Sequence, residues 1–175
     1  MAYLPSVPND SGVRVALDMF TPKFRTAMSS FIPAIMKDGE RLTRADKETI
    51  AAYVSQLNSA SYCFAAHSNA SRKHGVENAV FDGLESGVDG APVRDEFRPI
   101  LRFVAKLTLS PEAMTKSDVD AVLAAGWSEV DLHEAICVCA RFNMMNRLTL
   151  GHGLVHELER DPSKKSPTVP KESAK

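Results

Sequence analysis

Cys63 and His67 are the residues of this sequence whose types and spacing best suit chemistry. A cluster of small polar residues at 58–61 precedes them and predicts the start of a helix. Cys63 then lies in the first helical turn, where free backbone N–H groups and the positive end of the helix dipole stabilise a thiolate. We therefore expect the pKa of Cys63 to be lowered and its sulfur to be a reactive nucleophile.

His67 could supply the proton transfers that such a nucleophile needs. It lies one helical turn after Cys63, so the two side chains share a helix face, with Cβ atoms about 5–6 Å apart. The imidazole could accept the thiol proton or deliver a proton to a leaving oxygen. A cysteine and a histidine at this spacing also occur by chance, because buried cysteine is commonly a small apolar packing residue.

Glu48 is a candidate partner for the imidazole. It lies on the helix predicted before that of Cys63, and the short connection at 58–61 should fold the two helices antiparallel. Its carboxylate could then orient the His67 ring. Taken alone, a glutamate at this position is typical of a solvated helix surface.

The elements that must position these residues are all predicted to be helices. Apolar residues recur at helical spacing through most of the chain, without the alternation of strands, so the fold class is all-α. Pro33 indicates a kink or break in the second helix, and Thr43 with Asp46 forms a capping pair at the third. We expect helices over 11–20, from 21 to about 38, from 43, from 61 to 74, one short helix within 76–92, over 94–107, from a Ser117 cap to 126, and from Ser128.

Length and composition favour a single domain. The chain has 175 residues and 44% hydrophobic content, enough for one core. We expect an N-terminal extension over 1–10, a helical domain over 11–159 and a disordered C-terminal tail over 160–175, since both ends are rich in proline and the tail also in lysine.

The charge balance excludes several classes of partner. Lysine and arginine number 21 against 22 acidic residues, so we expect neither nucleic acid nor a membrane surface as a partner. A signal peptide and a membrane-spanning run are both absent from the sequence, which predicts a cytoplasmic protein. Three cysteines without framework spacing are expected to be free thiols. We expect no cofactor and no metal, because no cysteine or carboxylate completes a ligand set around His152 and His156.

A longer pattern surrounds the cysteine and the histidine. AhpD-like proteins carry a glutamate, eleven intervening residues, and then Cys-x-x-Cys-x-x-x-His at the start of a helix. Glu48, Ala60, Cys63 and His67 have the same spacing here. Further runs, KLTLSPEAMTKSDV at 106–119, AAGWS at 124–128 and FNMMNR at 142–147, resemble the same family. Over roughly residues 20–155 the chain resembles the AhpD-like and carboxymuconolactone decarboxylase family, in its peroxidase-related branch.

The resemblance implies an AhpD-like helical bundle and a thiol-dependent hydroperoxide reductase with an antioxidant role. Cys63 would be the thiolate that attacks the peroxide, His67 the proton shuttle and Glu48 its partner. Tyr62, Asn143 and Asn146 are possible pocket residues, although simple packing explains Tyr62 equally well. The resemblance also implies a homo-oligomer, commonly a trimer or hexamer.

Ala60 departs from the family pattern, because it stands where the first cysteine of the pair belongs. A local disulfide is therefore impossible, and an oxidised Cys63 would need an external thiol reductant. Cys137 and Cys139 are two residues apart on a predicted helix and point to different faces, so we expect core residues and not a resolving pair.

Two alternatives remain open at this stage. The first is a lyase of the carboxymuconolactone decarboxylase kind, acting on a small organic acid, in which His67 is the acid or base and Cys63 is dispensable. The second is a non-enzymatic oligomeric, redox-sensing protein that has lost turnover together with the first cysteine.

Overall fold

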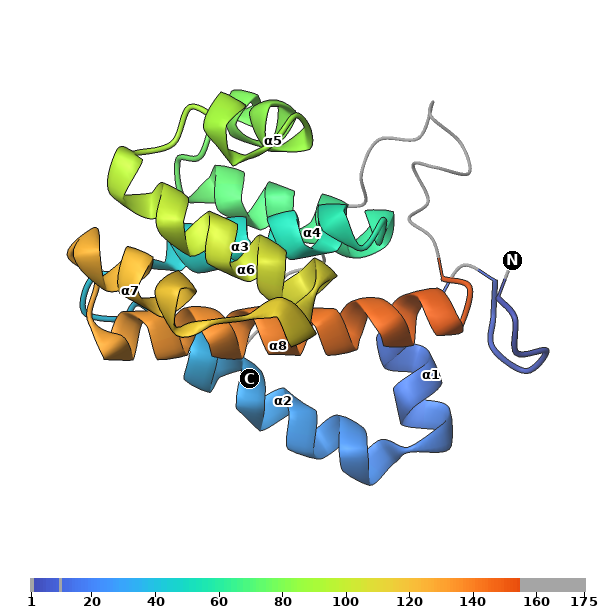
Figure 1. Cartoon of the computed structure of the whole chain (residues 1–175). Helices are drawn as coiled ribbons and strands as arrows, with labels where there is room; N and C mark the ends of the chain where they lie inside the picture. The colour runs from blue at the N-terminus through green and yellow to red at the C-terminus, as the bar shows by residue number, and fades with distance from the viewer. Residues whose placement is uncertain (1, 10, 155–175) are drawn as a thin grey trace.

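The computed structural model describes residues 2–9 and 11–154, and every regular element in them is a helix, which confirms the all-α prediction (Figure 1). The elements are α1 (Val13–Phe20), α2 (Pro22–Met36), α3 (Arg44–Leu57), α4 (Ser61–Lys73), α5 (Asn78–Glu85), α6 (Arg98–Leu109), α7 (Lys116–Ala124) and α8 (Glu129–Gly151), with short 3-10 turns at Val88–Gly90, Asp95–Phe97 and Pro111–Ala113.

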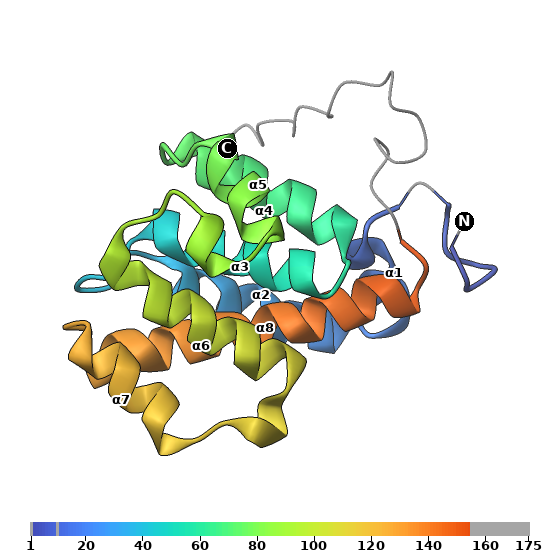
Figure 2. The ribbon, with the colours of Figure 1, turned by 45° about the horizontal axis from the view of Figure 1, so that its top comes forward.

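Helix α3 forms the centre of the bundle. Residues 46–55 are all buried, as expected for a helix that is covered on every side. It packs against α4, α6 and α8, and α6 packs in turn on α8 (Figures 1 and 2). The 23 residues of α8 span about 35 Å, so one helix can touch most of the bundle. The position of α3 brings Glu48 into the interior.

Capping boxes start three of the helices. Thr43 with Asp46 caps α3 as predicted, and Ser128 with Asp131 caps α8 in the same way. The prediction that Ser117 caps α7 is wrong, because the cap is Thr115, whose amide donates to the Asp118 carboxylate at 2.7 Å.

Pro33 lies inside α2, and the helix continues through it to Met36. The sequence predicts a kink or a break there, because proline lacks the N–H that bonds to the preceding turn, and the continuous helix rules out the break. The residues of that turn, 29 and 30, are exposed, so water can satisfy the carbonyl that the proline leaves without a donor.

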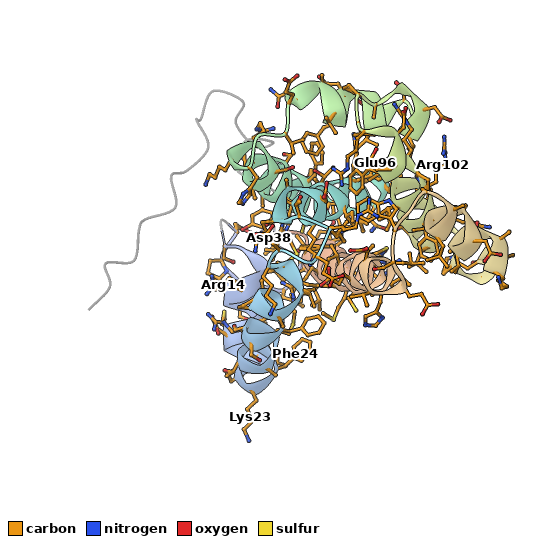
Figure 3. All side chains as sticks on the ribbon, turned by 90° about the vertical axis from the view of Figure 1, so that its left-hand side faces the viewer. Arg14, Lys23, Phe24, Asp38, Glu96 and Arg102 are labelled. Carbon is orange, nitrogen blue, oxygen red and sulfur yellow. The ribbon has the colours of Figure 1, made fainter. Side chains whose placement is uncertain are left out.

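Helices α1 and α2 form a hairpin that extends from the bundle below α8, with Lys23 at its far end (Figures 1 and 3). A small second core holds its base, and Val7 of the N-terminal segment belongs to that core. The hairpin exposes large apolar side chains, namely Val15, Met19, Phe20, Phe24, Phe31 and Ile32.

The C-terminal part of the chain is described as far as Leu154. The predicted tail over 160–175 and the end of the predicted domain, with His156, lie outside the described residues. Within 2–9 and 11–154, no helix is long and apolar enough to cross a membrane.

Candidate active site

A cavity of about 430 Å³ lies between the α1–α2 hairpin and helices α3, α4 and α8. Cys63 and His67 line it from α4, and Glu48 lines it from α3. Most of the remaining lining is apolar, apart from Tyr62 and a few charged side chains. The full lining comprises Gly12, Val13, Arg14, Val15, Ile32, Met36, Arg44, Glu48, Tyr62, Cys63, Ala66, His67, Arg141, Phe142 and Met145. We call this space the Cys63 cavity.

Cys63 is the third residue of α4 and only 6% exposed. Its Sγ lies 3.5 Å from the Thr149 hydroxyl of α8. Burial raises the pKa of the Cys63 thiol, and the hydrogen bond with Thr149 offsets only part of that rise. The prediction of a lowered pKa is therefore wrong, because desolvation outweighs the position in the first turn. Cys63 is a neutral thiol at rest.

The raised pKa of Cys63 predicts a specific pH dependence of alkylation. Iodoacetamide should label Cys63 with a midpoint above the free thiol value of about 8.5, because the thiolate is the reactive form. Thr149→Val removes a hydrogen bond that favours the thiolate, so its midpoint should move higher still. Mass spectrometry of the Cys63 peptide across pH gives both midpoints.

The matched control for this labelling is Thr108→Val, which removes the hydroxyl beside Cys139 and touches nothing at Cys63. It should leave the Cys63 midpoint unchanged. A midpoint below the free value in the unaltered protein, or a downward shift in Thr149→Val, would contradict the burial argument.

His67 and Glu48 meet inside the bundle. The His67 Nδ1 lies 2.7 Å from Glu48 Oε2, and the Glu48 side chain is almost completely buried. Burial raises the pKa of Glu48, but hydrogen bonds and charges from His67 and Arg44 together lower it below its ordinary value. The carboxylate is therefore ionised, and it accepts the Nδ1 proton of the ring.

Two further contacts fix this pair. Arg44 Nε donates to Glu48 Oε1 at 2.8 Å, and a second Arg44 nitrogen donates to the Met36 carbonyl. On the other side, the Phe142 ring packs against the imidazole with centroids 4.2 Å apart. With Nδ1 held by Glu48, Nε2 carries the lone pair and can act as a base. Within the described residues, Nε2 has no hydrogen-bond partner.

Tyr62 lines the Cys63 cavity, whereas Asn143 and Asn146 do not. Asn143 joins helices, since it accepts a hydrogen bond from Asn58 and donates one to Thr108. Asn146 is fully buried and accepts a hydrogen bond from Ser55. Both amides are therefore structural links between α8 and the bundle and not pocket residues.

Sequence reasoning missed three residues of the site: Arg44, Thr149 and Arg141. Arg44 had a local signal, because an arginine four residues before a glutamate can pair with it on one helix face. Thr149 and Arg141 come from α8, far from Cys63 in the sequence, and only the tertiary structure places them beside α4.

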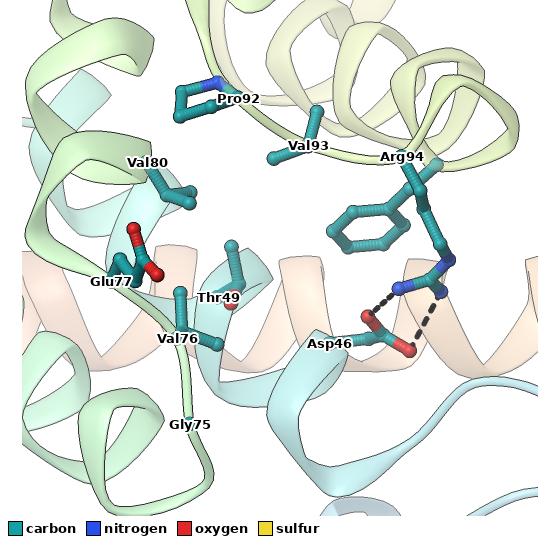
Figure 4. Close-up of a pocket in the computed structure, with 10 residues that line it drawn as sticks. Asp46, Thr49, Gly75, Val76, Glu77, Val80, Pro92, Val93 and Arg94 are labelled. Atoms are coloured by element: carbon teal, nitrogen blue, oxygen red, sulfur yellow. Dashed lines mark hydrogen bonds and ion pairs between the residues drawn. The ribbon is translucent and has the colours of Figure 1, made fainter.

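A second cavity, of about 310 Å³, lies on another part of the bundle and contains none of these residues (Figure 4). Its main polar feature is the pair in which Arg94 donates to both carboxylate oxygens of Asp46, at 2.7 and 2.9 Å. Asp46 also caps α3, so its oxygens are already used. In the part of the chain that the structure describes, no group of three or more histidine, cysteine or acidic side chains could hold a metal ion.

Comparison with known families finds a match over one segment of the chain. The model of the carboxymuconolactone decarboxylase family matches residues 22–82, a segment that includes Glu48, Cys63 and His67. The match over this segment and the shared fold bear out the predicted resemblance to AhpD-like and carboxymuconolactone decarboxylase proteins.

Solved structures of other proteins share this fold. An uncharacterized peroxidase-related protein from Silicibacter sp. TM1040 is 25% identical with a TM-score of 0.73, over 82% of this chain and 74% of that one. An AhpD-core peroxidase-related protein from Ralstonia eutropha JMP134 shares the fold at 23% identity and a TM-score of 0.74. The match covers 82% of this chain and 76% of that one. A putative antioxidant defence protein AhpD from Agrobacterium tumefaciens shares the fold at 19% identity and a TM-score of 0.68. The match covers 89% of this chain and 99% of that one. A comparison with curated protein sequences finds no match.

Proposed function

We propose that this protein is a thiol-dependent hydroperoxide reductase that acts through Cys63. The observation that carries the proposal is that Cys63 and the His67–Glu48 pair line the same cavity. The peroxidase-related name of the Silicibacter protein supports an antioxidant role. A nucleophile, a base and a carboxylate that orients the base are the three parts that such catalysis needs.

The reaction begins with a neutral thiol. His67 Nε2 takes the Cys63 proton as the sulfur attacks the outer oxygen of the hydroperoxide ROOH. The O–O bond breaks, the sulfur is oxidised to a sulfenic acid, and the imidazolium returns the proton to the leaving alkoxide to give ROH. Glu48 stabilises the transient imidazolium and so favours removal of the proton from a thiol whose pKa is raised.

Recovery of Cys63 requires an external thiol. Ala60 cannot form a disulfide, Cys139 is buried against Thr108, and Cys137 lies beside His133; none of these lines the cavity. An external thiol R′SH condenses with the sulfenic acid, releasing water and leaving a mixed disulfide. A second R′SH then releases the Cys63 thiol and R′SSR′.

Mass spectrometry after mild peroxide treatment tests the proposal. With tert-butyl hydroperoxide and dimedone present, we expect a dimedone adduct on the Cys63 peptide and none on Cys137 or Cys139, because only Cys63 shares a cavity with the His67–Glu48 pair. Dithiothreitol added first should reduce the sulfenic acid and prevent the adduct. An unmodified Cys63 peptide with no consumption of hydroperoxide would reject the proposal and leave the non-enzymatic alternative.

A lyase acting through His67 is the second candidate. Two observations favour it: the raised pKa of Cys63, and the imidazole whose Nε2 is directed by a carboxylate partner. His67 would then move a proton on a small organic acid, and Cys63 would take no part. Turnover of an unsaturated lactone acid by Cys63→Ser, without hydroperoxide reduction by the unaltered protein, would establish this candidate.

We also propose that the protein works in the cytoplasm as a homo-oligomer, a trimer or hexamer, with neither nucleic acid nor membrane as a partner. The exposed apolar side chains of the α1–α2 hairpin support self-association, because large apolar patches on a surface commonly mark contacts between proteins.

A further inference from the structure

Arg141 is a buried cation that forms no ion pair with any of the described residues. It lies on α8 and is only 6% exposed. Its Nε and one terminal nitrogen have no hydrogen-bond partner, and no carboxylate of the described residues lies within ion-pair distance. A guanidinium stays charged in proteins, and a buried charge without a partner is costly. Burial also lowers the pKa of Arg141, which reports the same desolvation.

The position of Arg141 indicates what could pair with it. It lines the Cys63 cavity, where Glu48 is the only acid among the described lining residues. Both Glu48 oxygens are occupied, one by His67 and the other by Arg44. No acid among the residues that the structure describes therefore balances the positive charge of Arg141.

The surroundings of Arg141 also hold it close to the reacting groups. Its guanidinium carbon lies 5.3 Å from the centre of the Phe142 ring, and the same ring packs on the His67 imidazole. The rest of the wall near them is apolar, from Ile32, Met36 and Met145 among others. A ligand with an anionic end and a hydrocarbon body matches this combination of a buried arginine that lacks an ion pair and a largely apolar wall.

We propose that Arg141 binds the carboxylate of the substrate, so that the protein acts on hydroperoxides of organic acids. The guanidinium offers paired N–H donors that fit a carboxylate, the hydrocarbon part contacts the apolar wall, and the hydroperoxide group meets Cys63. This inference rests on the proposed function for the reaction, but the carboxylate site itself is independent of it. Arg141 is thus a binding residue that sets specificity.

Octanoate and its neutral counterpart octanamide test the site without any chemistry. By titration calorimetry the unaltered protein should bind octanoate roughly 10- to 100-fold more tightly than octanamide, the range expected for hydrogen bonds to a charged group. Arg141→Met should remove this preference, and Arg141→Lys should retain part of it. Arg102→Met, which removes an exposed arginine outside the cavity, should bind like the unaltered protein.

Thermal unfolding separates a binding role from a structural one. Arg141→Met should unfold at the same temperature as the unaltered protein or higher, because a buried unpaired charge is lost. Octanoate should raise the unfolding temperature of the unaltered protein and of Arg102→Met, but not of Arg141→Met. Equal affinity for octanoate and octanamide, or a preference that survives in Arg141→Met, would overturn the inference.

Steady-state kinetics test the Arg141 site and the proposed hydroperoxide reduction separately. In the unaltered protein octanoate should raise the KM for tert-butyl hydroperoxide by competing for the cavity, with little change in kcat. Peroxide reduction without octanoate binding would reject the Arg141 site and retain the reductase. Octanoate binding through Arg141 without peroxide reduction would retain the site and reject the reductase.

Discussion

Cys63→Ser is expected to reduce the rate of hydroperoxide reduction by at least about 1,000-fold, because a serine hydroxyl cannot replace the attacking sulfur and loss of a nucleophile commonly costs this much or more. The substitution is nearly isosteric, and a hydroxyl at position 63 can keep the hydrogen bond with Thr149. We therefore expect the variant to fold and to keep its unfolding temperature within a few degrees. Consumption of tert-butyl hydroperoxide with dithiothreitol as donor measures the loss.

Cys137→Ser is the matched control for this prediction. Cys137 lies on α8 beside His133 and outside the cavity, so its replacement should leave the rate unchanged. Equal activity in Cys63→Ser and the unaltered protein would show that the reaction does not use this sulfur. Loss of activity in both variants would point instead to a thiol relay through α8.

The capping boxes and the pairing of Glu48 with His67 show what the sequence could predict. Thr43 with Asp46, and Ser128 with Asp131, are local patterns whose geometry is complete within one turn. Glu48 and His67 lie on consecutive helices joined by a short connection, so an antiparallel pair brings them together almost regardless of the rest of the fold.

The environment of Cys63 could not be predicted in the same way. Its position in the first turn of α4 is local and was anticipated, but its burial depends on other parts of the chain. Thr149, which bonds to its sulfur, is 86 residues away, and the walls contributed by α1 and α2 close the cavity. Desolvation of Cys63 depends on this assembled environment, which is why the direction predicted from the sequence for its pKa shift is wrong.

The sequence also could not predict which residues of α8 face the Cys63 cavity. The prediction of Asn143 and Asn146 as pocket residues rests on a family-like run, yet each residue of a helix is rotated by about 100° from the one before it. Resemblance places the run near the site, but it does not say which positions face the cavity. Arg141 and Phe142 face it, whereas the two amides face neighbouring helices.

His67→Gln is expected to lower kcat/KM for tert-butyl hydroperoxide by about 100- to 10,000-fold near neutral pH, the usual contribution of a positioned acid or base. The effect should be large because the resting thiol has a raised pKa and needs an acceptor for its proton. Glutamine retains a side-chain amide that can bond to Glu48, so the buried carboxylate keeps a partner. Circular dichroism and the unfolding temperature check that the variant is folded.

The pH dependence of His67→Gln distinguishes proton transfer from packing. As the pH rises from about 7 toward about 9.5, a growing fraction of Cys63 ionises without help, so the deficit of the variant should shrink. The deficit should shrink with rising pH because the pKa of Cys63 is raised. The thiolate is therefore scarce at neutral pH and accumulates only above the ordinary thiol range. His133→Gln, at an exposed position of α8, should behave like the unaltered protein at every pH. A deficit of the same size across the whole range would mean that His67 supports the structure of the cavity and moves no proton.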